Sequence, residues 1–278
     1  GNGGAISATS GDVTVSSGII TGCSADAGGA IYHSGNGTIT IDGTAELQNN
    51  TARSGNGGGI CAASGAISIL GTSHVSGNHA DNGFGGAIYG DGVMLSVGEA
   101  ATISGNSAKA GGAAYASQGT VTVSRTAGVT PPSITNKSAS TGNGGAFYVG
   151  EGSAEIAGGT LTGNTAINGN GGAIYASGAN ITLGSDAVVG ASGSANRAAA
   201  GGAVYAESGM VTVSGASVAG NSAITGNGGA IYAGSGAVTV SGGSVEDNTA
   251  ATNGGAVYAS SGSVTLSDNA HMSRNTAN

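Results

Sequence analysis

Apolar and polar residues alternate in short pieces that recur along the whole chain. Residues 30–32 (AIY) and 121–123 (VTV) are two such pieces, rich in β-branched and aromatic side chains, and this pattern predicts strands. Gly, Ser and Asn, which are typical of turns, bound each piece. A further apolar residue, such as Val245, stands three residues before an Asn. Each unit therefore contains three short predicted strands.

The pattern repeats ten times in register. The string GGAIY or a variant of it begins at residues 3, 28, 57, 85, 111, 144, 171, 201, 228 and 254, a mean spacing of about 28 residues. Units of this kind are expected to form one solenoid domain over residues 1–278. Its repeats begin near residues 1, 26, 55, 83, 109, 142, 169, 199, 226 and 252.

Two units are longer than the rest. They run from residue 111 to 144 and from residue 171 to 201, and the first contains a loop around Pro131 and Pro132. Insertions in solenoids emerge as loops, often on the working face. Neutral drift of a tolerated loop is the alternative interpretation.

The repeat predicts the fold class. Three short strands cannot bury an apolar face alone, but they can when identical units stack on them. Each strand would lie parallel to the matching strand of the next unit, about 4.8 Å away. We therefore expect an all-β, right-handed parallel β-helix (β-solenoid) of about ten coils of ~28 residues, with three strands per coil. Such a rod would be of order 50 Å long.

All eight tyrosines occupy one outward column. In the first strand an inward apolar residue, such as Ile174, is followed by the residue whose side chain points outward. An exposed aromatic stripe can bind sugars or proteins, or the rings can cover one another and stabilise the sheet. The possible binding stripe consists of Tyr89, Tyr115, Tyr148, Tyr175, Tyr205, Tyr232 and Tyr258. Cys61 and Ser7 interrupt the same column near the N-terminus.

A polar column follows the third strand. Eight of its ten positions are Asn, and Cys23 and Lys137 fill the other two. Asn tolerates the left-handed conformation of a sharp corner, and stacked amides hydrogen-bond along a column. We expect a structural ladder of Asn50, Asn78, Asn106, Asn164, Asn196, Asn221, Asn248 and Asn275. Cys23 and Cys61 lie in different columns, too far apart for a disulfide.

The repeat resembles that of the chlamydial polymorphic membrane proteins, which carry GGA(I/L/V) and FxxN. The matching segments are residues 28–31 (GGAI) with 47–50 (LQNN), and 228–231 (GGAI) with 245–248 (VEDN). An aliphatic residue replaces the Phe of FxxN throughout. The resemblance covers the whole chain. It implies a right-handed β-helix passenger of a secreted, autotransporter-like adhesin, exposed at the cell surface.

Composition and charge exclude several classes of protein. Gly makes up 59 of 278 residues, and charged residues make up 7%, where ~25% is usual. Helix formers are scarce, and no apolar run could cross a membrane as a helix. With six basic residues and a net charge of −8, a nucleic-acid partner is not expected.

The titratable residues do not form a catalytic pattern. The acids are scattered over the coils. The nearest groupings, Glu151 with Glu155 and Glu246 with Asp247, do not recur on adjacent coils. General acid/base chemistry needs two facing carboxylates, so we predict no catalytic residue, no metal site and no cofactor. A carbohydrate-binding or polysaccharide-cleaving β-helix using an outer face remains the alternative.

A threonine column suggests a minor alternative, ice binding. The residue between the two inward valines of the second strand is mostly Thr, with Ser two residues later, as in Thr212 and Ser214. We place Met94 and Glu155 in the same column, where they interrupt the array. Thr at an exposed strand position also reflects simple β-propensity.

The two ends of the sequence are in phase. The chain begins at Gly1 without Met or an apolar leader, so we expect a processed or excised piece. Joining Asn278 to Gly1 reproduces the internal sequence of the repeats. We therefore predict a non-enzymatic, extracellular structural or adhesive solenoid that is a segment of a longer stalk or stacks head to tail into a filament. Its first partner is itself, with a host or cell-surface glycan or protein as a further partner. No membrane insertion is expected.

Overall fold

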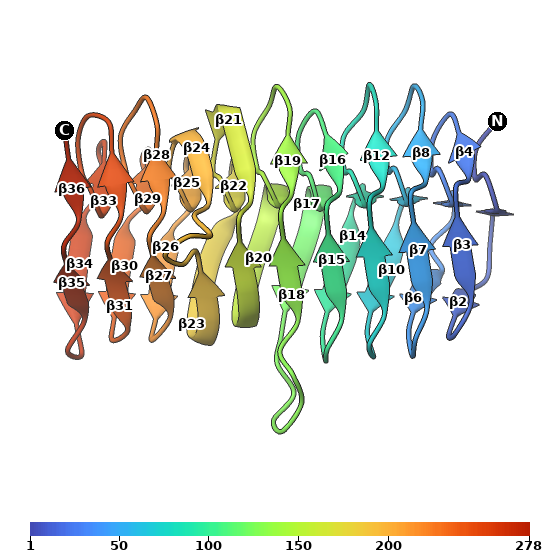
Figure 1. Cartoon of the computed structure of the whole chain (residues 1–278), viewed down its shortest axis with the longest axis horizontal. Helices are drawn as coiled ribbons and strands as arrows, with labels where there is room; N and C mark the ends of the chain where they lie inside the picture. Colours follow the sequence, from blue (N-terminus) through green and yellow to red (C-terminus); the bar gives the residue numbers. More distant parts are fainter.

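The protein is a rod of stacked coils in which the chain advances by one coil per repeat (Figure 1). The computed structural model describes all residues, 1–278, and every regular element in it is a β-strand. In Figure 1 the front strands β3 (Ile19–Thr21), β7 (Glu46–Gln48) and β15 (Thr102–Ser104) run upward while the chain advances from right to left. This sense of winding makes the coil right-handed, as predicted.

Each coil contributes strands to four faces of the rod. The first face holds β1 (Ile6–Ala8), β5 (Ile31–His33), β9 (Ile60–Ala62), β13 (Ile88–Gly90), β17 (Ala114–Val123), β20 (Phe147–Thr162), β22 (Ile174–Ala176), β25 (Val204–Ala206), β29 (Ile231–Ala233) and β33 (Val257–Ala259). The second holds β2 (Val13–Val15), β6 (Thr38–Ile41), β10 (Gly65–Ile69), β14 (Val93–Val97), β23 (Asn180–Val189), β26 (Val211–Ser214), β30 (Val238–Ser241) and β34 (Val264–Ser267), with the later parts of β17 and β20.

The third face continues around the corner. It holds β3, β7, β11 (His74–Ser76), β15, β18 (Ser133–Thr135), β27 (Ser217–Ala219), β31 (Ser244–Glu246) and β35 (His271–Ser273), with the ends of β20 and β23. The fourth holds β4 (Ser24–Ala25), β8 (Thr51–Ala52), β12 (His79–Ala80), β16 (Ser107–Ala108), β19 (Ser138–Ala139), β21 (Thr165–Asn170), β24 (Arg197–Ala200), β28 (Ser222–Ala223), β32 (Thr249–Ala250) and β36 (Thr276–Ala277).

The fourth strand is a difference from the three strands per coil predicted above. Ten short strands form a sheet of their own from β4 to β36. Most of them are two-residue Ser/Thr-Ala pieces such as Thr51–Ala52, in which only the alanine is buried. A piece of this length carries no readable alternation. Its pairing comes from the stacking of whole coils rather than from its own sequence.

Matching strands pair in parallel and in register, so each column of equivalent residues runs along the rod. On the first face, for example, Ile31 pairs with Ile60 and Tyr205 with Tyr232. The inward columns form one core of 52 buried residues, to which Phe147 contributes the bulkiest aromatic side chain. Stacking thus gives a thin but continuous core to a chain that is poor in large apolar residues.

The Gly-Gly pair of GGA makes the entry into the first face. The first Gly has a left-handed φ in every coil, for example +69° at Gly171. The second lies against the fourth-strand backbone, and a Cβ on Gly172 would lie 2.1 Å from the oxygen of Gly202 and 2.5 Å from the nitrogen of Arg197. The Ala that follows is buried, as at Ala173. In the GGA motif, the first Gly is therefore required by its left-handed φ, the second Gly by the close approach of backbone, and the Ala fills the core.

A Gly172→Ala variant should fail to form the native coil at this position, because its Cβ collides with backbone rather than with a movable side chain. We expect a fall in the denaturant midpoint equivalent to about 3 kcal/mol or more, or loss of soluble rod. Gly178→Ala is the matched control, since its nearest contact would be 3.6 Å away. Equal midpoints for the two variants would show that the close approach is not a constraint.

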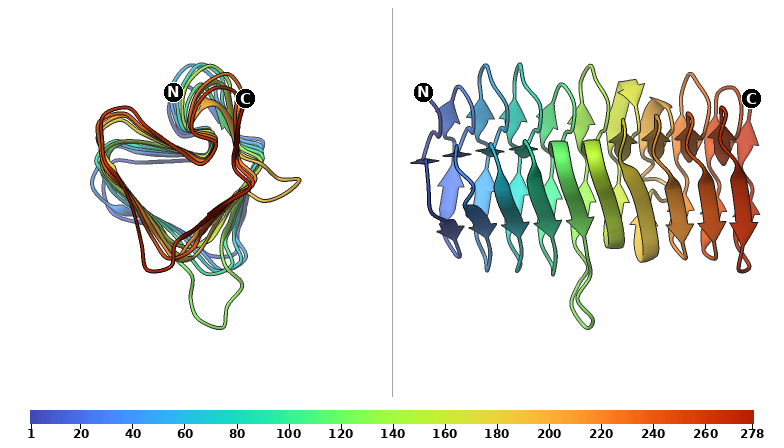
Figure 2. Two further views of the ribbon diagram at one scale, coloured as in Figure 1. Left: turned by 90° about the vertical axis from the view of Figure 1, so that its left-hand side faces the viewer. Right: turned by 180° about the vertical axis from the view of Figure 1, so that it is seen from behind.

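The two long repeats do produce loops, as predicted. Residues 124–132, between β17 and β18, and residues 191–195, between β23 and β24, leave the stack. Both project beyond the outline of the other coils in the end-on view of Figure 2. No helix in the structure is long and apolar enough to cross a membrane.

Candidate functional site

The eight predicted ladder asparagines lie in one column, and all of them except Asn275 in the last coil are buried. In a typical step, the backbone N–H and Nδ2 of Asn50 both donate to Oδ1 of Asn78, at 3.0 and 2.9 Å. Nδ2 also donates to a carbonyl of the preceding coil, as Asn78 does to Leu47 at 2.9 Å. The same pattern recurs down to Asn275. Each amide therefore saturates backbone groups that a sharp corner would otherwise leave unpaired.

The left-handed residue at this corner is not the ladder Asn itself, and here the sequence interpretation was wrong. The residue before it takes the positive φ, for example Asn49 at 53° and Asp247 at 54°. In several coils a Gly occupies this place, for example Gly163 at 66°. The ladder Asn is instead selected by its hydrogen bonds. An apolar residue three positions before the ladder Asn thus begins a run of four positions with different roles. The first is a core residue, the second points outward, the third has the left-handed φ and the fourth supplies the ladder amide.

Lys137 interrupts the ladder between Asn106 and Asn164. Its side chain is 1% exposed, and its Nζ donates only to the carbonyl of Thr135, at 3.0 Å. A lysine has no acceptor atom, so the Nδ2 of Asn106 keeps a single partner, the carbonyl of Val75. Burial holds the pKa of the Lys137 amine well below its usual range. The ladder therefore consists of two separate runs.

The tyrosines from Tyr89 to Tyr258 form a continuous stack on the first face. Adjacent ring centroids are 4.2 to 5.6 Å apart, and the rings of Tyr205 and Tyr232 are 4° from parallel. Most of the rings are half-buried, and Tyr175 is buried. Phe84 adds its ring against Tyr115. Because each ring face contacts the next ring, the stack offers mainly ring edges to a ligand.

The stack also shifts the phenol equilibria. Burial raises the pKa of Tyr89, Tyr115, Tyr175 and Tyr205, and the pKa of Tyr205 reaches about 12. Neighbouring phenols add to the effect, because an ionised ring would repel the next. The hydroxyl of Tyr175 also donates to Oε2 of Glu207 at 2.6 Å, which favours the protonated phenol.

Alkaline pH should therefore destabilise the rod. A phenol whose folded pKa lies above its unfolded value of about 10 stabilises the fold below pH 10, and this stability is lost as pH rises toward 12. We expect phenolate absorbance to show a group of tyrosines that titrate only at or above pH 12 while the rod is folded. In denaturant, all should titrate near pH 10. A single titration near pH 10 in the folded protein would contradict the stack.

The threonine column is more regular than predicted, but still interrupted. Ser96 pairs with Ser68 and Thr122, so it occupies the place that the sequence interpretation wrongly assigned to Met94. Met94 lies two residues earlier and is exposed. The error arose because β14 extends further than its valine pattern indicated. Glu155 does lie in the column, between Thr122 and Thr182.

Most of the acids and all of the histidines make local structural contacts. Arg274 Nε and Nη2 lie 2.6 and 2.9 Å from the Asp247 carboxylate, and Nη2 is 2.6 Å from Glu246. His79 Nδ1 lies 2.5 Å from the Ser107 hydroxyl. No three His, Cys, Asp or Glu side chains come together as metal ligands could. Cys23 and Cys61 are both free thiols, and burial raises the pKa of Cys61 to about 11.

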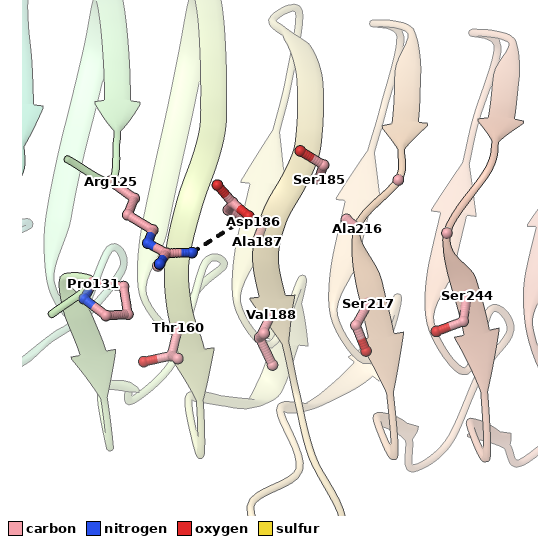
Figure 3. A pocket seen from close by; sticks show the side chains of 13 residues that line it. Arg125, Pro131, Thr160, Ser185, Asp186, Ala187, Val188, Ala216, Ser217 and Ser244 are labelled. Atoms are coloured by element: carbon pink, nitrogen blue, oxygen red, sulfur yellow. Dashed lines mark ion pairs between the residues drawn. The ribbon is translucent and has the colours of Figure 1, made fainter. Parts of the chain in front are cut away.

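One cavity lies on the corner between the second and third faces, and sequence reasoning missed it. This corner trough has a volume of about 500 Å³ and is lined by Arg125, Pro131, Gly159, Thr160, Ser185, Asp186, Ala187, Val188, Gly215, Ala216, Ser217, Gly243 and Ser244. Arg125 Nη1 reaches Asp186 Oδ1 at 3.5 Å across the trough, as the dashed line in Figure 3 shows. The over-length repeat was the only signal in the sequence that pointed to this corner.

Comparison with known proteins supports the resemblance found in the sequence. The family model of the Chlamydia polymorphic membrane protein repeat matches residues 242–260. The chain carries a repeat of this family's type. The matched stretch includes the ladder corner at Asn248, β32 and the Gly254-Gly255 entry of β33, so it contains the two features that shape each coil. No curated protein and no solved structure matches the chain.

Proposed function

We propose that the protein is a non-enzymatic structural and adhesive rod of a bacterial cell surface, and that copies of it stack end to end. Two findings support this role. The matched family consists of membrane proteins by its description, and the stacked coils form a long, regular scaffold. The observation that carries the proposal is the exposed apolar side chains and unpaired strand edges of the first and last coils.

The last coil exposes side chains that every interior coil buries. Val264 and Leu266 are 43% and 50% exposed, whereas the equivalent Val238 and Val240 of the preceding coil are 0% exposed. At the other end, Ile6 and Ile20 are only partly covered. Fully burying a side chain of this size contributes about 1.5–3 kcal/mol, and a partner would cover the part of each that is still exposed. The end coils therefore favour contact with another apolar surface.

The backbone of the end coils points to the same partner. The strands β33 to β36 pair with a neighbour on one side only, as do β1 to β4. An unpaired parallel edge is a template for another strand. Each end therefore fits a coil of the same kind, as a second copy of the chain would supply. Charge opposes this contact little, because the last repeat carries only Asp268, Arg274 and His271 as titratable side chains other than Tyr258.

A junction between two copies would lack one ladder step. Asn275 accepts from Asn248, and in a stack its own donors would meet residue 23 of the next copy. That residue is Cys23, whose sulfur is a weak acceptor. We therefore propose that copies associate more weakly than internal coils do, so that association depends on concentration.

Sedimentation of the purified chain tests this proposal. Leu266→Glu should reduce end-to-end association, because it places a charge in the contact, whereas Cys23→Asn should strengthen it by restoring the missing amide. Leu70→Glu, a substitution on a corner outside both ends, is the matched control. Association that is absent at high concentration, or unchanged in both end variants, would overturn the proposal.

A further inference from the structure

We propose that the corner trough binds a neutral oligosaccharide whose chain lies along the rod axis. The inference deepens the proposed adhesive function, since it names the site and the class of ligand. It rests on the shape of the trough, on its free hydrogen-bonding groups and on the pairing of the backbone groups around it.

The lengths of successive corners build the trough. Between the second and third faces, the coils before the trough use four residues, as at 70–73 and 98–101. The next coil has the nine-residue loop 124–132 there, and the following coils use no connecting residue or only two, as at 215–216 and 242–243. Residues 268–270 then widen the corner again. The trough is therefore a recess that begins beside the projecting loop and runs over the coils whose corners are short.

Close packing keeps the floor of the recess low. A Cβ on Gly158 would lie 2.7 Å from Cβ of Arg125, and one on Gly243 would lie 2.4 Å from the carbonyl oxygen of Ala216. Gly159, Gly215 and Gly243 also have left-handed φ values of 106°, 80° and 70°. Larger residues at these places would be strained as well as crowded. Backbone therefore forms much of the floor, and a flat ligand can approach it.

A row of hydroxyl groups runs along the trough, one or none per coil. Thr160, Val188, Ser217 and Ser244 stand on adjacent strands in register, and Figure 3 shows their side chains in one line. Thr160 donates to Ser133 at 3.3 Å. Ser217 and Ser244 have no partner within the protein, so their hydroxyls can bind a ligand. Adjacent coils are about 4.8 Å apart, close to the length of one sugar ring in an extended chain.

The charged pair suits a neutral, hydroxyl-rich ligand. Arg125 and Asp186 are 41% and 54% exposed and approach each other at a single nitrogen–oxygen contact. Arg125 retains several N–H donors and Asp186 retains acceptor positions, the two kinds of group that a sugar hydroxyl can engage at once. An acidic sugar would be repelled by Asp186, and the trough contains no second base.

The backbone around the trough argues against an extended peptide as the ligand. A peptide that adds to a sheet needs an edge with free N–H and C=O groups. Here these groups are paired between coils. The backbone N–H of Thr160 donates to the carbonyl of Pro132 at 2.9 Å, and the backbone N–H of Ser244 donates to the carbonyl of Ala216 at 2.9 Å. No aromatic ring lines the trough, so binding would rest on hydrogen bonds and would be weak for a single site.

A panel of neutral oligosaccharides of increasing length, with uronic acid oligomers alongside, tests the inference by array and calorimetry. We expect at least one neutral oligomer to bind, with affinity that rises with length up to about the number of coils spanned. Ser217→Tyr should fill the trough and weaken binding at least tenfold, and Asp186→Ala should also weaken it. Ser104→Tyr places the same ring on the same face outside the trough and should bind as the unaltered protein does.

Three results would overturn the inference: no binding by any neutral oligomer, binding that is confined to acidic oligomers or to proteins, or binding that Ser217→Tyr and Asp186→Ala leave unchanged. Thermal melts establish that the variants are folded, and Asp186→Ala, an exposed corner change, keeps the test decisive if Ser217→Tyr disturbs the coil. The outcome is separable from that of the end-association test, because the trough lies several coils from the N-terminal end and the two tests measure different properties.

Discussion

Replacing Asn78 by Ala should lower the free energy of unfolding by roughly 3 to 6 kcal/mol. The side chain is fully buried and makes bonds on both sides of its coil. Its loss leaves the N–H of Asn50, one Nδ2 hydrogen of Asn50 and the carbonyl of Leu47 without partners. Each unsatisfied buried group costs about 1–3 kcal/mol. Denaturant unfolding followed by circular dichroism measures the change.

Asn82→Ala is the control for this experiment. Asn82 lies four residues further along the same coil, is exposed and makes one bond, to the carbonyl of Arg53. We expect its loss to change stability by less than about 1 kcal/mol. Similar effects for Asn78→Ala and Asn82→Ala would mean that the ladder does not stabilise the stack as its geometry indicates.

The second large effect has the opposite sign: Lys137→Asn should stabilise the protein. An amide at this position can accept from Asn106 and donate to the neighbouring coils, which joins the two runs of the ladder. Two restored bonds contribute about 2 kcal/mol. Removing a buried amine with a strongly lowered pKa adds to this. The denaturant midpoint should therefore rise.

The pH dependence identifies the amine as the cause. In the folded protein the Lys137 pKa is lowered, so the unfolded chain binds more protons and stability rises with pH. The unaltered protein should gain up to about 1.4 kcal/mol per pH unit relative to Lys137→Asn, until pH approaches the unfolded value of about 10.4. A constant difference between the two proteins from pH 7 to pH 10 would show that folding does not lower the pKa of Lys137.

The sequence predicted the coil well, because each inward column carries the same kind of residue in every repeat. Ile31, Leu47 and Val245 are core residues, as the alternation indicated. The column of asparagines followed from the same register. Parallel in-register stacking makes such columns contiguous, so even a thin pattern becomes reliable when it recurs ten times.

Features that depend on packing between coils could not be predicted from the repeat. The pair Thr51–Ala52 is too short to show a period, and it forms a strand only because the next coil lies on it. The left-handed place at the ladder corner is held by Gly in several coils but by Asn, Asp or Arg in others, so composition does not identify it. The trough arises because the corners differ in length from coil to coil. A consensus repeat averages over these differences and therefore does not show them.

Lys137 shows how the regular ladder tolerates a costly exception. A polar column gives each amide two neighbours, and a long amine can occupy the same space without completing the bonds. In a solenoid, each coil interacts mainly with its two neighbours. The cost is therefore local, and the runs on either side remain intact.

Electron microscopy of the purified chain at increasing concentration tests the central proposal, that copies of this rod stack end to end. A single chain of ten coils should appear as a rod about 50 Å long. The account predicts straight rods of unchanged width whose lengths are multiples of that value and grow with concentration. Rods that stay at single length at every concentration, or that aggregate side by side, would contradict it.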